Sequence, residues 1–195
     1  MQVFLDLWGV LLDPDKMQRE YGRRLGIRLK DRFGGTEAQW VQAHNAAWTA
    51  YVRAVESTDW TRGSWAAAAD DLDAQFTLRL LEGAGIAWRP PDPVAFSREL
   101  ERDIMSTVDA RFPDARPAIE RLRIGHHGVN VATQATESNA RGALAGAGLL
   151  DGIDALFTGS TVDAPKSARA YWERVLAATR ADPQDCVLVD DRLDY

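Results

Sequence analysis

Short apolar runs alternate with helical patterns in the second half of the chain. After residue 113 the pattern predicts, in order, helix 115–122, strand 129–133, helix 138–147, strand 155–157, helix 167–179 and strand 186–190. Such alternation is typical of a parallel sheet whose strands are joined by crossover helices. At the start of the chain, the apolar run 3–12 predicts one more strand, which delivers Asp6 into a turn at Gly9.

Between these parts, residues 14–109 show helical periodicity and hardly a strand. Apolar residues recur at spacings of three and four from Trp40 to Val55. The pattern predicts helices over 36–56, 63–82 and 93–108. Because tryptophans at helical spacing belong more often to a core than to a substrate site, we expect most of these rings to be core. We therefore expect a core domain of residues 1–13 and 110–195 and an inserted helical domain of residues 14–109.

Composition limits the class of protein. The 195 residues suit one domain with a large insertion, and 46% hydrophobic with 27% charged residues is typical of a soluble globular chain. A net charge of -6 gives no general support for a nucleic-acid partner. No stretch is apolar enough to predict a membrane span or a signal peptide. The single Cys186, inside an apolar run, favours a reducing compartment. We expect a cytoplasmic protein that binds neither nucleic acid nor membrane.

Side chains suited to phosphoryl chemistry follow the strand-like runs. They are Asp6, Thr133, Lys166 just after a turn, and the adjacent pair Asp190 and Asp191. In parallel sheets, ligands gather beyond the carboxyl ends of the strands. The pattern therefore predicts one catalytic centre assembled from distant parts of the chain.

Each of these side chains has a chemical use. The Asp6 carboxylate can attack an electrophilic centre and form a covalent intermediate. The Thr133 hydroxyl can donate to a bound oxyanion, and the Lys166 ammonium can neutralise charge on nucleophile and substrate. Asp190 and Asp191 offer the hard oxygen ligands that Mg²⁺ prefers. The structural alternatives are a strand-end cap for Asp6, a turn residue for Thr133 and a surface position for Lys166.

With these candidate residues in this order along the sequence, the chain resembles the haloacid dehalogenase (HAD) superfamily of hydrolases. The motifs that carry the resemblance are Asp6-Leu7-Trp8-Gly9-Val10 for the nucleophile loop, Thr133, Lys166, and Val189-Asp190-Asp191 for the acidic motif. The resemblance covers essentially the whole chain. It implies an α/β fold: a Rossmann-like three-layer core with a parallel sheet of strand order 3-2-1-4, and an all-helical cap inserted between the first and second motifs.

The resemblance also implies the site. The catalytic residues would be Asp6, Thr133 and Lys166. Mg²⁺ would be bound by Asp6, the backbone carbonyl of Trp8, Asp190 and Asp191, with Asp194 as a further candidate. The substrate, a small anionic molecule, would contact Trp8, Gly9 and Gln134.

The sequence departs from the family pattern at Trp8. Phosphatases of the family have a second Asp at this position, which protonates the leaving oxygen, whereas an indole has no proton to exchange near neutral pH. Family dehalogenases also lack that Asp and have an aromatic Tyr there, but they work without metal and have a weakened acidic motif. Both Asp190 and Asp191 are present here. Three interpretations stay open: a Mg²⁺-dependent hydrolase of a phosphorylated metabolite, a metal-independent dehalogenase-like hydrolase, and a non-catalytic relative that binds a ligand or partner.

The second departure is at the end of the sequence. Tyr195 follows directly after the acidic motif, where the family usually continues with a helix and at least one more strand. As written, the fourth strand would be a sheet edge with unpaired backbone groups. We expect either a shortened form of the protein or another chain, including a second copy, that covers this edge.

Overall fold

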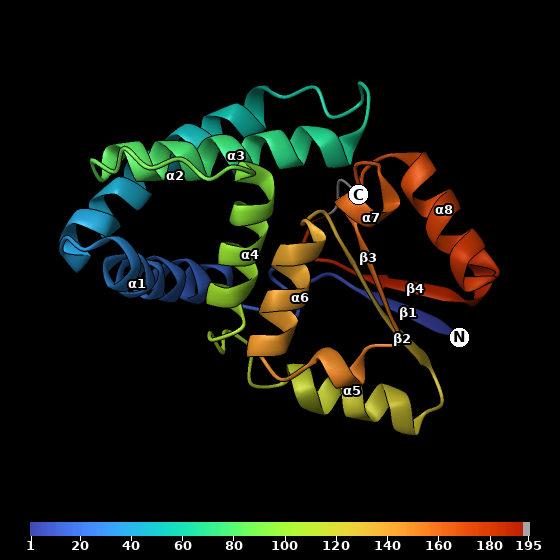
Figure 1. Cartoon of the computed structure of the whole chain (residues 1–195). Helices are drawn as coiled ribbons and strands as arrows, with labels where there is room; N and C mark the ends of the chain where they lie inside the picture. Colours follow the sequence, from blue (N-terminus) through green and yellow to red (C-terminus); the bar gives the residue numbers. More distant parts are fainter. Residues whose placement is uncertain (193–195) are drawn as a thin grey trace.

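A four-stranded parallel sheet lies beside a block of long helices in the computed structural model, which describes residues 1–192 (Figure 1). The strands are β1 (Gln2–Leu5), β2 (Gly128–Thr133), β3 (Ala155–Thr158) and β4 (Cys186–Val189). Their order is β3-β2-β1-β4, and all three neighbouring pairs are parallel. The predicted α/β fold and strand order 3-2-1-4 are confirmed. Asp194 lies outside the described residues.

Helices cover both faces of the sheet because the strands place successive side chains on opposite faces. On one face, Val3 and Val131 pack against α5 (Ala115–Ile124) and α6 (Glu137–Gly146). On the other, Phe4 and Ala132 pack against α7 (Gly159–Val162) and α8 (Arg169–Thr179). The core therefore has three layers. Two short 3₁₀ helices, Leu150–Gly152 and Pro183–Asp185, precede β3 and β4.

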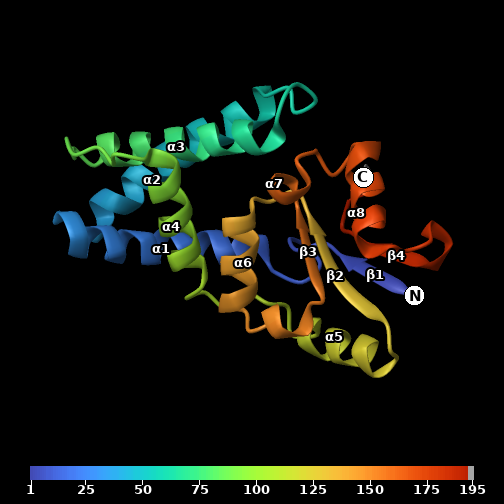
Figure 2. The same ribbon diagram turned by 45° about the vertical axis from the view of Figure 1, so that its right-hand side comes forward.

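The remaining helices form a block with its own hydrophobic core, which we call the helical block. It consists of α1 (Pro14–Phe33), α2 (Glu37–Ser57), α3 (Trp65–Gly83) and α4 (Pro93–Met105). Each begins at a side-chain N-cap that accepts from the backbone three residues on: Asp13, Thr36, Ser64 and Asp92 respectively. Leu25, Trp40, Leu80 and Leu81 are among its buried core residues. In Figures 1 and 2, β1 runs from the N-terminus toward this block.

The structure corrects several sequence-based boundaries. The apolar run 3–12 forms a strand only to Leu5, because Leu7, Leu11 and Leu12 belong to a tight turn whose side chains enter the core. Gly9 donates to the Leu12 carbonyl across that turn, at 2.9 Å. The helix predicted over 167–179 begins at residue 169, and the four-residue α7 was not predicted. Elsewhere the predicted helices and strands differ from the observed ones by a few residues at their ends.

Side chains of α4 and of the N-cap of α3 join the helical block to the core by hydrogen bonds at two places among the described residues, and Met17 of α1 packs into the core cluster. Glu101 of α4 accepts hydrogen bonds from Asn139 (2.8 Å) and Ser138 (2.8 Å) at the start of α6. Farther along, α4 and α6 pack so closely that a Cβ at Gly146 would lie 2.4 Å from the Met105 carbonyl oxygen. At the other place, Ser64 donates to Asp163 at 2.9 Å, just after α7. The block is thus held over the carboxyl ends of the strands.

The β4 strand pairs with β1 on one side, and its side chains are largely exposed. Val187 and Val189 are each 42% exposed. That another chain covers the free edge of β4 stays a prediction. Among the described helices, none combines the length and apolar character that a membrane crossing requires.

Candidate active site

Asp6 lies directly after β1, at the carboxyl edge of the sheet. Its backbone N–H donates to the Val189 carbonyl at 2.9 Å, which extends the β1–β4 pairing and fixes the position of Asp6. The residue is only 7% exposed. Burial raises the pKa of the Asp6 carboxyl above its usual value, and the Lys166 ammonium opposes that rise. Asp6 is therefore a nearly buried carboxyl whose ionised form depends on a neighbouring cation.

Lys166 supplies that cation, and its side chain is fully buried. Its Nζ lies 2.9 Å from Asp6 and 2.5 Å from Asp190. The alternative interpretation of a surface lysine is therefore wrong. Its backbone N–H donates to the Gln134 side chain at 2.6 Å, so the loop after β2 fixes the segment before α8. This contact explains how a residue outside any regular element is held in place.

Three carboxylates meet beside Lys166. One oxygen from each of Asp6, Asp190 and Asp191 lies within 4.8 Å of the others. Asp190 is nearly buried and bonded to Lys166, whereas Asp191 is exposed. Hard carboxylate oxygens at this separation suit Mg²⁺, which commonly binds one or two carboxylates together with substrate oxygens and water. The donor set fits the predicted metal. The Trp8 carbonyl as a further ligand stays a prediction.

Gly9 lets the loop after β1 approach this cluster. Its φ is +80°, a left-handed conformation that favours glycine. A Cβ at this position would lie 2.3 Å from Asp191 Oδ2. Any larger residue would therefore displace the Asp191 carboxylate or the loop.

Thr133 and Gln134 complete this edge of the sheet. Thr133 ends β2 and is 1% exposed, and its hydroxyl oxygen accepts from the Ala135 N–H at 3.4 Å. That bond uses a lone pair and leaves the hydroxyl hydrogen for another acceptor. Gln134 is half-buried, and its side-chain oxygen is used by Lys166. Both residues line the cavity described next.

A small cavity of about 190 Å³, the acidic cavity, opens at the cluster. Its wall consists of Asp6, Trp8, Gly9, Pro14, Thr133, Gln134, Asp191 and Arg192. The predicted substrate contacts Trp8, Gly9 and Gln134 therefore surround one space together with Asp6. Lys166 and Asp190 are not part of this wall: Lys166 contacts Asp6, and Asp190 contacts Lys166.

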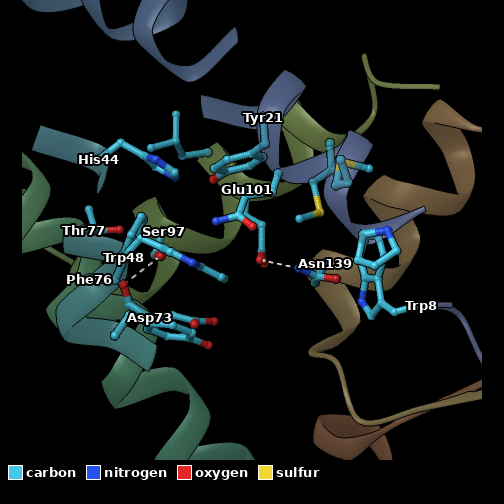
Figure 3. Close-up of a pocket in the computed structure, with 16 residues that line it drawn as sticks. Trp8, Tyr21, His44, Trp48, Asp73, Phe76, Thr77, Ser97, Glu101 and Asn139 are labelled. Atoms are coloured by element: carbon cyan, nitrogen blue, oxygen red, sulfur yellow. Dashed lines mark hydrogen bonds between the residues drawn. The ribbon is translucent and has the colours of Figure 1, made fainter. Parts of the chain in front are cut away.

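A second cavity, of about 290 Å³, lies between the helical block and the core, and we call it the aromatic cavity (Figure 3). Trp8 and Pro14 line both cavities, which therefore adjoin each other. Tyr21, Trp48, Tyr51 and Phe76 supply further aromatic rings. Trp48, expected mainly as a core residue, lies at this cavity and is 37% exposed. Trp40 is core, as expected.

Sequence reasoning missed two carboxyl groups in the aromatic cavity, Asp73 of α3 and Glu101 of α4. Burial, followed by the Glu101 charge, holds the pKa of Asp73 well above its usual range. Burial also raises the pKa of Glu101, against the effect of its hydrogen-bond donors. A signal was present in the sequence, because Asp73 lies four residues after Ala69 and four before Thr77, on the buried side of α3. An acidic residue within an apolar helical stripe indicates a buried carboxyl group.

Comparison with known proteins identifies the family of the chain. The family model for haloacid dehalogenase-like hydrolases matches residues 2–194, and the chain belongs to that family. A search of curated protein sequences gives no match.

Solved structures with the same fold include both phosphatases and dehalogenases. A magnesium-bound HAD hydrolase, YfnB from Bacillus subtilis, is 15% identical with a TM-score of 0.60, over 99% of this chain and 78% of that one. A HAD phosphatase from Thermococcus onnurineus is 16% identical with a TM-score of 0.59, over 99% and 78%. L-2-haloacid dehalogenase from Xanthobacter autotrophicus, with chloropropionic acid covalently bound, is 15% identical with a TM-score of 0.55, over 96% and 68%. At these identities the likeness shows the fold alone.

Proposed function

We propose that this protein is a Mg²⁺-dependent hydrolase of a small phosphorylated metabolite, with Asp6 as the nucleophile. The observation that carries the proposal is the placement of one buried ammonium, Lys166, against Asp6 within a cluster of three carboxylates. Such an arrangement suits an anionic nucleophile that must meet an anionic substrate. In this proposal residues 14–109 act as a cap over residues 1–13 and 110–195.

The chain's own residues account for the steps. A carboxylate oxygen of Asp6 forms a bond to phosphorus while the bond from phosphorus to the leaving oxygen breaks. Lys166 balances the charge on Asp6, and the Thr133 hydroxyl donates to a phosphoryl oxygen. Water then attacks the phosphorus of the aspartyl phosphate, which releases phosphate and restores Asp6. Bound at Asp6, Asp190 and Asp191, Mg²⁺ would supply positive charge beside the phosphoryl oxygens.

A dehalogenase-like hydrolase is the second candidate, and the aromatic Trp8 in the wall of the acidic cavity favours it. A halide leaves without protonation, so that reaction has no need of an acid at this position. The three clustered carboxylates favour the phosphatase, because a second and third carboxylate near Asp6 repel an anion unless a cation balances them. Dependence on Mg²⁺ separates the two, and inactivity toward phosphate esters and haloacids alike would favour a non-catalytic relative.

Magnesium is expected to raise the melting temperature of the wild-type protein. A ligand that binds only the folded state stabilises it by mass action, and saturation at 100 times the dissociation constant corresponds to roughly 5 to 10 °C for a chain of this size. Asp191→Asn is expected to remove most of the shift, whereas Asp151→Asn, an exposed acid outside the cluster, should leave it unchanged. Differential scanning fluorimetry measures this, and equal shifts in all three proteins would contradict the metal assignment.

The leaving group is expected to decide the rate in the wild-type protein. Aryl phosphates should be cleaved far faster than alkyl phosphates, because an aryl oxide leaves with little need of a proton and Trp8 provides none. Trp8→Asp is expected to raise alkyl phosphate turnover selectively, by up to roughly 10²-fold if the new carboxyl reaches the leaving oxygen. Trp8→Asn is the control, since it leaves the same space without an acid. Comparable aryl and alkyl rates in the wild type would show that another residue supplies the proton.

A further inference from the structure

The aromatic cavity combines rings with two acidic groups and lacks a basic counterpart. Among the described residues that line it, Asp73 and Glu101 are the carboxyl groups, and none is a lysine or arginine. Arg98, whose charge acts on Asp73, is bonded to Asp70 and does not line the cavity. The wall therefore has two acidic groups and no lysine or arginine, and a bound cation would favour the ionised form of these acids.

His44 does not act as that cation. It is 3% exposed and lies edge-on to Phe76 and stacked against Trp48, with ring centroids 5.7 and 6.4 Å away. Burial lowers the pKa of its imidazole below the usual value, which favours the neutral form near neutral pH. Within the aromatic cavity the two carboxyl groups thus face aromatic rings and a neutral imidazole, whereas Arg192 lines the adjoining space that both carboxyl groups also border.

Asn139 adds an unsatisfied acceptor at the same cavity. Its Nδ2 donates to Glu101 at 2.8 Å, which fixes the orientation of the amide. Its Oδ1 is buried and has no hydrogen-bond partner among the described residues. A buried acceptor without a partner is costly, and an N–H donor on a ligand would satisfy it. Figure 3 shows Asn139 between Glu101 and Trp8.

The rings suit a cation as well. Trp48 stacks against Tyr51 with centroids 5.4 Å apart, and Phe76 meets both at nearly right angles. Aromatic faces attract ammonium groups, and the attraction grows when water is excluded. Asp73 lies 9% exposed beside this group of rings. The carboxyl groups, the ring faces and the unsatisfied Asn139 acceptor each favour a ligand that carries an ammonium group.

We propose that the aromatic cavity binds a protonated amine on the organic part of the substrate, among Trp48, Tyr51 and Phe76 and near Asp73 and Glu101. The proposal rests on the proposed function for the other end of the substrate, because this cavity adjoins the one at Asp6. The substrate class is then a phosphate monoester of an amino alcohol. Its phosphate lies at Asp6 and its ammonium group in the aromatic cavity.

Binding of two isosteric alcohols tests the amine site without any turnover. By ligand-observed NMR titration, 3-aminopropan-1-ol is expected to bind the wild type about tenfold more tightly than butan-1-ol, a difference on the scale of a cation–π contact with a neighbouring carboxylate. Asp73→Asn should remove that preference. Asp71→Asn, an exposed acid on the same helix, should retain it. Equal affinities of the two alcohols for the wild type would overturn the proposal, whether or not Asp73→Asn folds.

Turnover of the matching esters separates this proposal from the proposed function. With Mg²⁺, 3-aminopropyl phosphate is expected to show a KM about tenfold lower than butyl phosphate, which has the same length and no charge at that end. Hydrolysis of both esters with equal KM would overturn the amine site and leave the phosphatase intact. Preference for the amine in binding, without hydrolysis of either ester or of an aryl phosphate, would support the amine site and reject the phosphatase.

Discussion

Asp6→Asn is expected to abolish hydrolysis while the protein keeps its fold. The amide has the shape of the carboxylate but is a poor nucleophile, and loss of the nucleophile in a covalent hydrolase costs on the order of 10⁶-fold in rate. Lys166 retains its second partner, Asp190, at 2.5 Å, so no buried cation is left unpaired. Turnover of an aryl phosphate, with circular dichroism and melting temperature as folding checks, measures both parts of the expectation.

Asp109→Asn is a suitable control, because Asp109 is an exposed acid whose ion-pair partner, Arg111, also lies outside both cavities. It should keep wild-type turnover. Activity of Asp6→Asn close to the wild-type value would show that the reaction takes place at another group.

Lys166→Met is expected to lower the free energy of unfolding by about 3 to 5 kcal/mol, the cost of removing one partner from a buried ion pair. The lysine is fully buried, and the side chains it leaves, Asp6 and Asp190, are 10% and 6% exposed. Both carboxylates would then repel each other without a counter-charge. Urea denaturation in the absence of Mg²⁺ measures this loss.

Two further variants test whether the loss of stability in Lys166→Met comes from the unpaired buried charges. Lys30→Met removes an exposed ion pair with Glu37 and should cost at most about 1 kcal/mol. The double variant Lys166→Met with Asp190→Asn should be more stable than Lys166→Met alone, because one of the two unpaired carboxylates is gone. A loss for Lys166→Met no larger than that for Lys30→Met would contradict the account of Lys166 as the counter-ion of the site.

The sequence predicted the core of the fold well, for physical reasons. Strands buried on both faces form continuous apolar runs, as Val3 to Leu5 do, and alternation with helices leaves few topologies. Prediction was poorer at the turn after Asp6. There Leu7, Leu11 and Leu12 are as apolar as a strand, yet their backbone curls so that all three side chains enter the core.

The acidic cavity was predictable because each of its chemical groups follows a strand end. Thr133, Asp190 and Asp191 are brought to Asp6 by the sheet itself. The burial of Lys166 was not predictable, since it depends on the contact between its backbone and Gln134, which is 32 residues away.

The aromatic cavity was harder to foresee, because its wall combines residues of five helices and the loop at Trp8. Asp73 and Glu101 are separated by 28 residues, and only the packing of α3 against α4 brings them to one space. A single sequence indicates that each is an acid in an apolar stripe but not that they face the same cavity.

The central claim, that Asp6 forms a covalent bond to phosphorus, is tested most directly by rapid quenching. Wild-type protein mixed with an aryl phosphate and Mg²⁺ in ¹⁸O-labelled water, stopped within the first turnover, is digested and analysed by mass spectrometry. The account predicts a phosphoryl group on Asp6 in the quenched protein and ¹⁸O in the released phosphate, because water attacks phosphorus. Turnover without a phosphoryl group on Asp6, or with that group on another residue, would contradict it.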